Sequence, residues 1–143
     1  GYVDYNYRLG LRPAKIILNE VTSTNPSSIN GFIEVAGHRA GVVIANANGI
    51  VVDNGGFINT SHAVFTTGKP IMNGSLDTYR VNGGNVTVTG QGLDAKTTDR
   101  FDIISADADI TAGIWGGDEI NIVTGHNIVD ATDLHNQKLD YAL

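Results

Sequence analysis

Short apolar runs alternate with turn-forming strings along most of the chain. Val, Ile, Phe and Thr dominate the apolar runs, and strings such as "NPSSING", "NANG", "DNGG" and "VNGGN" separate them. β-branched and aromatic residues favour strands, whereas Asn and Gly favour tight turns. The pattern predicts an all-β chain, with strands expected at residues 14–21, 31–37, 39–45, 49–53, 56–60, 63–68, 78–83, 85–90, 101–106, 109–115 and 119–125.

The character of these runs favours one all-β architecture over another. A β-sandwich or an up-and-down barrel would show longer strands in which apolar and polar residues alternate. Here several runs, such as "GVVIA" and "FDIIS", are apolar throughout. Short strands joined by Asn- and Gly-rich corners are typical of a parallel β-helix, in which each rung pairs with the next. We therefore expect a parallel β-helix whose inward-facing core residues are Ile17, Ile33, Val35, Val43, Ile50, Phe57, Ile58, Val64, Val86, Ile103, Ile110, Ile114 and Ile122.

A rung count and two departures from a plain coil are expected. At ~20 residues per rung, the chain would hold roughly seven rungs. The stretch 70–100 contains the polar, Gly-rich strings "PIMNGSLD" and "GQGLDAKTTD", which predict an excursion out of the coil. The tail from Asp130 to Leu143 has a weakly amphipathic spacing of leucines, which allows a short helix there.

The stretch "IANANGIVVDNGGFINTSH" (44–62) carries the densest corner signal. Corner residues of a coil often adopt a left-handed backbone conformation, which Gly reaches freely and Asn reaches more easily than other residues. We therefore expect positive φ at Gly49 and at Gly55 or Gly56.

Charge and composition exclude several classes of partner. The formal net charge is −6, and no run of Lys or Arg is present, so nucleic acid and anionic membrane surfaces are unfavourable partners. No Cys is available for a disulfide or a thiolate metal site. No apolar run approaches the ~20 residues of a membrane span, so membrane insertion is not expected.

The candidate chemistry is sparse. Asp94, Asp99, Asp102, Asp107 and Asp109 crowd one segment with Arg100. They lack calcium-loop spacing, so we interpret them as a solvated acidic face.

No cofactor or metal is expected, since the histidines have no metal-ligand spacing. Ser61 and His62 are adjacent without an assignable third partner. Trp115 reads as a core or capping residue in preference to a sugar platform. The four histidines are His38, His62, His126 and His135.

A longer stretch resembles a known family. The string "ILNEVTSTNPSSINGFIEVAGHRAGVVIANANGIVVDNGGFINTSHAVFTTGKP", followed by "GLDA", "DIISADADITAGIW" and "INIVTG", resembles the secretion domain of two-partner secretion exoproteins. This family includes filamentous haemagglutinin-type adhesins, secreted haemolysins and contact-dependent growth-inhibition toxins. The resemblance covers roughly residues 14 to 127. It implies a right-handed parallel β-helix without enzymatic activity.

The resemblance also implies a partner and a destination. Such a module belongs to a very large exoprotein of a Gram-negative bacterium. A dedicated outer-membrane β-barrel transporter recognises it in the periplasm, and the exoprotein reaches the cell surface or the medium.

Two asparagine motifs of the family are implied as the recognition site. The second motif, Asn-Pro-Asn-Gly-Ile, matches Asn46, Asn48, Gly49 and Ile50, with Ala47 where proline is usual. The first, Asn-Pro-Asn-Leu, matches only at Asn6 and Leu9, and Val52 and Gly55 stand where many members carry a Cys pair. Two interpretations stay open for Asn46 and Asn48. They either set the corner through backbone hydrogen bonds or contact the transporter directly.

The ends of the chain suggest how the coil is bounded. We interpret residues 1–143 as a single domain and as a fragment of a longer secretion domain, with a divergent segment at 1–13 and a tail at 128–143. A solenoid has two open ends that expose unpaired backbone and core. We expect the segment 1–13 to leave the first rungs incompletely covered. The free edge would then add a strand from another chain, either a second copy in edge-to-edge self-association or the transporter.

Two alternative functions from other classes remain. One is an adhesin or glycan-binding β-helix, the role of the passenger in part of the family. The other is a polysaccharide-cleaving β-helix enzyme that uses clustered Asp residues, Ca²⁺ and a basic residue. The interpretation we favour is a non-catalytic secretion module.

Overall fold

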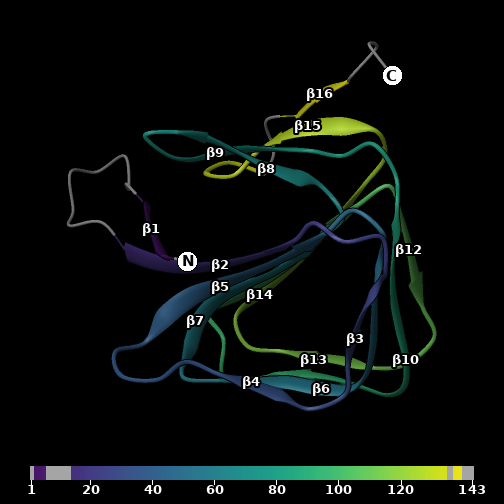
Figure 1. Ribbon diagram of the computed structural model, residues 1–143. Coiled ribbons are helices and arrows are strands. Elements are labelled where there is room, and N and C mark those ends of the chain that lie inside the picture. The colour runs from purple at the N-terminus through teal and green to yellow at the C-terminus, as the bar shows by residue number, and fades with distance from the viewer. Residues whose placement is uncertain (1, 6–13, 135–136, 140–143) are drawn as a thin grey trace.

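The chain winds into a parallel β-helix of about five coils (Figure 1). The computed structural model describes residues 2–5, 14–134 and 137–139. Two sheets form the wall of the coil, and a third sheet lies outside it. The predicted all-β class and parallel β-helix are therefore confirmed, with fewer coils than the expected seven because part of the chain leaves the coil.

Sheet A forms one side of the coil. Its strands β2, β5, β7, β11 and β14 are parallel, and β1 pairs antiparallel with β2 at one edge. The sheet consists of β1 (Tyr2–Tyr5), β2 (Ala14–Val21), β5 (Ala40–Asn46), β7 (Thr60–Thr66), β11 (Arg100–Ser105) and β14 (Glu119–Thr124).

Sheet B forms the other two sides. Its two long strands bend around a corner, so that each pairs with one short strand before the corner and with another after it (Figure 1). The sheet consists of β3 (Ser27–Ile29), β4 (Phe32–Glu34), β6 (Ile50–Ile58), β10 (Asn85–Ala95), β12 (Asp107–Ile110) and β13 (Ile114–Gly116).

The interior of the coil is packed with stacked apolar ladders. On sheet A, Val42, Ala63 and Phe101 face one another across successive strands, and Ile44, Phe65 and Ile103 do the same two residues further along. The rings of Phe57, Phe65 and Phe101 meet with centroids 5.4 to 5.8 Å apart. Parallel register places like residues above one another, so each rung buries the side chains of the rung before it.

Sheet C is an antiparallel sheet that leaves the coil and lies over the outer face of sheet A (Figure 1). Leu76, Tyr79 and Val129 of this sheet share a second apolar cluster with Val64 and Ile104 of sheet A. This cover explains why β5 is buried along its whole length and why its sequence shows no alternation. Sheet C consists of β8 (Lys69–Asn73), β9 (Ser75–Arg80), β15 (Asn127–Asp130) and β16 (Gln137–Leu139).

The excursion is shorter than predicted, and the tail forms strands. Only β8 and β9 leave the coil within the expected 70–100 stretch, because residues 85–95 form β10, which is part of the wall. In the described part of the tail, β15 and β16 pair antiparallel where the sequence had allowed a short helix.

Most of the expected core is buried, with two kinds of correction. Val35, Ile50, Phe57, Val86 and Ile103 lie inside the coil, and Ile17, Ile33 and Ile114 are partly buried against them. Val43 and Val64 are buried too, but on the outer face beneath sheet C instead of inside the coil.

Three expected core residues are exposed. Ile58 points outward from β6 and is 43% exposed. Ile110 and Ile122 lie on β12 and β14, which are the edge strands of their sheets within the described residues, so no further rung covers them.

The corner prediction is confirmed at one glycine and wrong at the other pair. Gly49 has φ +116, whereas Gly55 and Gly56 do not adopt positive φ. Their neighbours Asn54 and Asn59 take the left-handed conformation instead, with φ 61 and 56. Asn therefore supplies the left-handed corners here, as its short polar side chain permits.

The edge of sheet A at the first coil is covered by β1, which pairs with Ala14–Ile17. On the same end, β3 and β4 each pair with β6 alone among the described strands. The expected free edge thus belongs to sheet B and not to β2. Whether it adds a strand from another chain stays a prediction.

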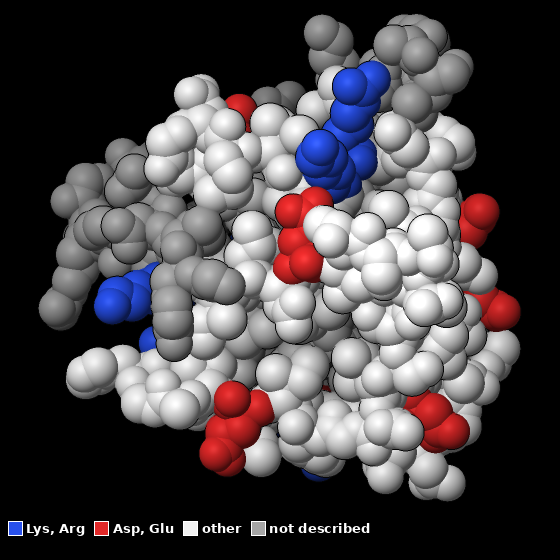
Figure 2. Space-filling model, viewed as in Figure 1, with Lys and Arg blue, Asp and Glu red and all other residues white. Residues whose placement is uncertain are grey.

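Charged side chains are sparse on the face of the molecule seen in Figure 2, and the acidic and basic ones are scattered. Most of that face is uncharged. Among the described residues, no helix is long and apolar enough to cross a membrane.

Candidate functional site

The second asparagine motif forms the corner between β5 and β6. The amide of Asn46 donates to the backbone oxygen of Asn25 and to the hydroxyl of Ser27, both at 2.9 Å. Its side-chain oxygen accepts from the backbone N–H of Asn48 at 2.9 Å. Asn46 is 1% exposed, so its side chain is buried inside the corner. Its bonds to Asn25 and Ser27 tie this coil to the one before it.

Asn48 stands on the surface of the same corner. Its amide donates to the backbone oxygen of Ser23 at 2.5 Å and to the side-chain oxygen of Asn46 at 2.9 Å. Both Ala47 and Asn48 are exposed. Of the two asparagines, only Asn48 is therefore within reach of a partner.

Gly49 and Ile50 complete the motif from the inside. A Cβ added at Gly49 would lie 3.0 Å from the backbone oxygen of Asn85 on the next coil, and the φ of +116 strains any other residue. Ile50 is fully buried in the core. Of the predicted site, Asn6 and Leu9 fall outside the described residues, so the structure does not place them.

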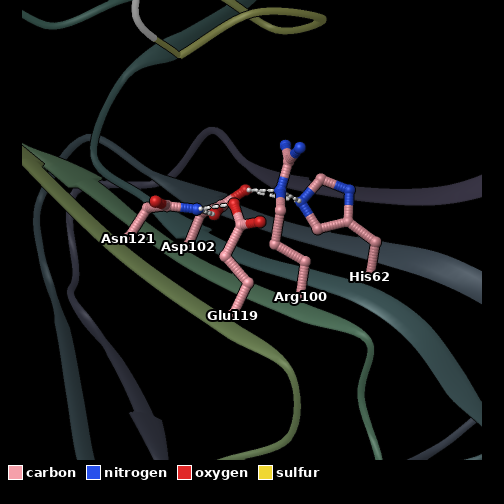
Figure 3. A network of polar contacts seen from close by, with 5 residues as sticks. All are labelled: His62, Arg100, Asp102, Glu119 and Asn121. Carbon is pink, nitrogen blue, oxygen red and sulfur yellow. Dashed lines mark hydrogen bonds and ion pairs between the residues drawn. The ribbon is translucent and has the colours of Figure 1, made fainter.

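A second polar cluster, which the sequence did not predict, lies on the outer face of sheet A (Figure 3). Asp102 is completely buried, and its Oδ2 lies 2.5 Å from Nε2 of His62 and 3.0 Å from Nε of Arg100. Asn121 donates to the other carboxylate oxygen at 2.9 Å and to Glu119 at 2.7 Å. We call these five residues the Asp102 network.

Hydrogen-bond geometry fixes the donors in this network. Nε of Arg100 also lies 3.2 Å from Nε2 of His62. A contact of 2.5 Å between Nε2 and a carboxylate requires an N–H on that nitrogen, which then cannot accept from arginine. His62 and Arg100 therefore donate to the same carboxylate oxygen.

The environment of Asp102 favours its charged form. Burial by itself would raise the pKa of this carboxyl. The hydrogen bond and charge of His62, the charge of Arg100 and the hydrogen bond from Asn121 outweigh burial, so the pKa of Asp102 lies below its usual value. The buried carboxylate ties three strands together, because it lies on β11 and bonds to His62 on β7 and to Asn121 on β14.

The Asp102 network does not have the form of a nucleophilic site. A triad needs a hydroxyl or thiol held by the histidine that the carboxylate orients. Within the described part of the chain, the polar contacts of His62 run to Asp102 and Arg100, and Ser61 is not among them. The arrangement supports a stabilising role.

The acidic segment does not assemble into one site. Asp99 pairs with Arg39 at 2.9 Å on the surface, and that hydrogen bond lowers the pKa of Asp99. Asp94 lies on another side of the coil, 3.7 Å from the Nζ of Lys96, while Asp107 and Asp109 are exposed on β12. Among the described residues, no group of three His, Cys, Asp or Glu side chains is arranged to hold a metal ion.

The remaining candidates lie apart. His38 and His126 are exposed, and His135 falls outside the described residues. Trp115 is 52% exposed, so the expectation that it serves the core is wrong. It stands on the outer face of β13, where outward positions meet solvent.

Sequence reasoning missed the Asp102 network because its members come from three coils. His62 and Asp102 are 40 residues apart, and only the parallel register of β7, β11 and β14 makes them neighbours. The one local signal was Asp102 inside the apolar run "FDIIS", since a lone carboxylate in a buried strand requires a partner.

The chain is similar in sequence to a known family and to several known proteins. A family model described as the TPS secretion domain matches residues 1–142. Over 132 residues, the chain is 48% identical to Toxin CdiA of Yersinia pestis, a match that spans 92% of this chain and 4% of that protein. It is 44% identical over 124 residues to tRNA nuclease CdiA-2 of Burkholderia pseudomallei, spanning 85% of this chain and again 4% of the relative.

A solved structure is similar as well. The crystal structure of the filamentous hemagglutinin secretion domain superposes with a TM-score of 0.78 at 30% identity, covering 96% of this chain and 51% of that one. The chain thus spans about half of that structure and a small fraction of its curated relatives.

Proposed function

The chain belongs to the TPS secretion domain family, and on this premise we propose that it directs a large exoprotein to a dedicated outer-membrane transporter. Proteins of this family are secreted by Gram-negative bacteria to the cell surface or the medium. In the proposed role, the folded coil is the element that periplasmic domains of the transporter bind. The observation that carries the proposal is the match to the family model over residues 1–142.

The geometry of the asparagine corner supports different roles for the residues of the motif, some structural and one in binding. Asn46 is buried and ties the corner to the previous coil through Asn25 and Ser27. Asn48 and Ala47 are exposed on the same corner. We assign Asn46, Gly49 and Ile50 to shaping the corner and Asn48 to the surface that the transporter contacts. Asn6 and Leu9 stay predicted members of the recognition site.

The proposed role requires no catalysis. The nuclease activities that appear in the names of some relatives describe whole proteins, of which this chain matches 4% of the length. The Asp102 network supplies a charged tie and lacks the hydroxyl or thiol contact of a nucleophilic centre in the described residues.

Binding to the transporter provides the test. The purified chain would be passed over the immobilised periplasmic domains of the outer-membrane transporter encoded beside its gene. We expect saturable binding, which Asn48→Ala weakens with a smaller loss of stability than Asn46→Ala, because Asn48 is exposed and water can replace its hydrogen bonds. Asn46→Ala should weaken binding and also cost ~1–3 kcal/mol of stability, because it leaves buried polar groups unpaired.

An exposed asparagine on β8, outside the coil, provides a matched control substitution. Asn73 is an exposed asparagine on β8, and Asn73→Ala should leave transporter binding unchanged. Absence of binding by the unaltered chain would refute the proposed function. Equal losses from Asn48→Ala and Asn73→Ala would refute the assignment of Asn48 alone.

A further inference from the structure

One side of the coil carries two exposed aromatic rings in a single ladder. Phe32 on β4 pairs with Gly56 on β6, Gly56 pairs with Asp94 on β10, and Asp94 pairs with Trp115 on β13. Phe32 is 51% exposed and Trp115 is 52% exposed. We call the outer surface of β4, β13 and the facing halves of β6 and β10 the open face.

Glycines let both rings lie against the backbone of this face. A Cβ at Gly56 would meet the ring of Phe32 at 2.4 Å. A Cβ at Gly113 would meet the indole of Trp115 at 2.9 Å, and one at Gly92 would meet it at 3.1 Å. Each ring therefore rests on bare backbone with part of its surface open to solvent. Among the exposed large hydrophobic side chains of the described residues, Phe32 and Trp115 are the two aromatic ones, and both lie on this face.

The spacing and polarity of the ladder resemble those of an extended ligand site. Adjacent strands lie ~4.8 Å apart, so the Cα atoms of Phe32 and Trp115 are separated by roughly 14 Å along the ladder. Asp94 stands between them with its side chain 35% exposed and with Lys96 beside it. A flat face with two apolar platforms and a carboxylate between them matches a chain of pyranose rings. The C–H faces of such sugars stack on aromatic rings, and their hydroxyls donate to carboxylates.

Charge narrows the class of ligand. The whole chain has a formal net charge of −6, and Glu34 and Asp94 lie on or beside the open face. A polyanion such as a nucleic acid or a uronic-acid polymer would be repelled there. A neutral chain of hexoses or N-acetylhexosamines would not.

From these observations we propose that the open face is a binding site for a neutral glycan chain, stacked on Phe32 and Trp115 and hydrogen-bonded by Asp94. This site is separate from the asparagine corner and does not depend on the secretion role. It gives the exposed Trp115 a function that the core does not.

Trp115 makes the test direct, because it is the one tryptophan in the sequence and so its fluorescence reports on the site itself. The purified chain would be titrated with chitohexaose and with cellohexaose. At least one of these neutral hexasaccharides should change the emission in a saturable way at micromolar to low-millimolar concentration. Phe32→Ala keeps the probe and should weaken affinity by roughly tenfold, the effect of losing one stacking platform.

Two further variants test whether binding depends on the open face. Trp115→Ala, read by calorimetry, should abolish detectable binding. Met72→Ala removes another large exposed apolar side chain, on β8, and should leave affinity unchanged. Circular dichroism of each variant confirms that the coil is intact.

The remaining outcomes would overturn the proposal. Unchanged fluorescence and calorimetry with both neutral hexasaccharides would remove the site. Equal losses from Met72→Ala and Phe32→Ala would show that binding is not located on the open face. Tighter binding of a galacturonate hexamer than of either neutral probe would refute the ligand class.

Discussion

Two outer faces of the same coil differ in solvent exposure. The outer face of sheet A, which we call the covered face, lies under sheet C, so that Val43, Val64 and Ile104 are almost completely buried. None of the described segments covers the open face in this way, and its outward residues Phe32 and Trp115 are half exposed. In both places the strands of the coil are parallel, so the coil alone does not decide the environment of an outward side chain.

Where sheet C leaves the coil and packs against sheet A, the outer surface of sheet A becomes one side of a second apolar core. Side chains on the two faces of β5 belong to two different apolar clusters, one inside the coil and one beneath sheet C. On the open face, the same outward positions carry glycines with aromatic rings folded over them.

The largest expected effect compares one substitution on the two faces. Ile104 and Ile58 both point outward, but Ile104 is fully buried and Ile58 is 43% exposed. Ile104→Ala should cost ~2–5 kcal/mol because it leaves a cavity beneath sheet C. Ile58→Ala should cost ~0.5 kcal/mol or less. Urea unfolding of both variants measures the difference, and similar values would mean that sheet C does not seal the covered face.

The next comparison pairs two outward aspartates. Asp102 on the covered face has no exposed side-chain surface, whereas Asp94 on the open face is 35% exposed. Asp102→Ala should cost ~3 kcal/mol, because it leaves Arg100 without its counter-charge and His62 without its hydrogen-bond acceptor. Asp94→Ala should cost ~0.5 kcal/mol or less. Chemical denaturation at neutral pH provides both numbers, and a small effect at Asp102 would show that the network is dispensable.

Acid should weaken the covered face through the same residue. The folded-state pKa of Asp102 is lowered, so its carboxylate contributes stability above its unfolded pKa of about 3.9. That contribution should be lost as pH falls from about 4 through the lower folded pKa. The stability gap between the unaltered chain and Asp102→Asn should narrow as the pH falls below about 4. A gap that is independent of pH in the acid range would contradict this account.

A modest effect on stability is expected when the exposed ring of Phe32 is removed from the open face. Phe32 is half exposed, so Phe32→Ala should cost ~1 kcal/mol or less. Its effect on glycan affinity should therefore appear without a comparable loss of folding stability. Thermal unfolding checks this, and a loss as large as that of Ile104→Ala would assign the ring to the core.

Local chemistry was sufficient for much of the coil. Short β-forming runs between Asn- and Gly-rich corners predicted the parallel β-helix, and the buried Ile50, Phe57 and Ile103 followed from their place in those runs. The corner at Gly49 was also predictable, because its conformation depends on neighbours within a few residues. The neighbouring choice of Gly55 or Gly56 was wrong since Asn54 and Asn59 satisfy the same backbone need.

Cover, register and edges depended on the tertiary structure. Nothing local distinguishes Ile104, which sheet C buries, from Ile58, which solvent reaches, because each is an outward residue on a β-strand. Likewise, Ile122 has the sequence context of a core residue but lies on an edge strand of the described coil. His62 becomes the partner of Asp102 only when rungs 40 residues apart are stacked in register. Most strands, the corner at Gly49 and the kind of coil could be predicted from local sequence, since they depend on short-range propensity. Which outward residues are buried, paired or left free was decided by long-range packing, because that environment is supplied by distant coils and by sheet C.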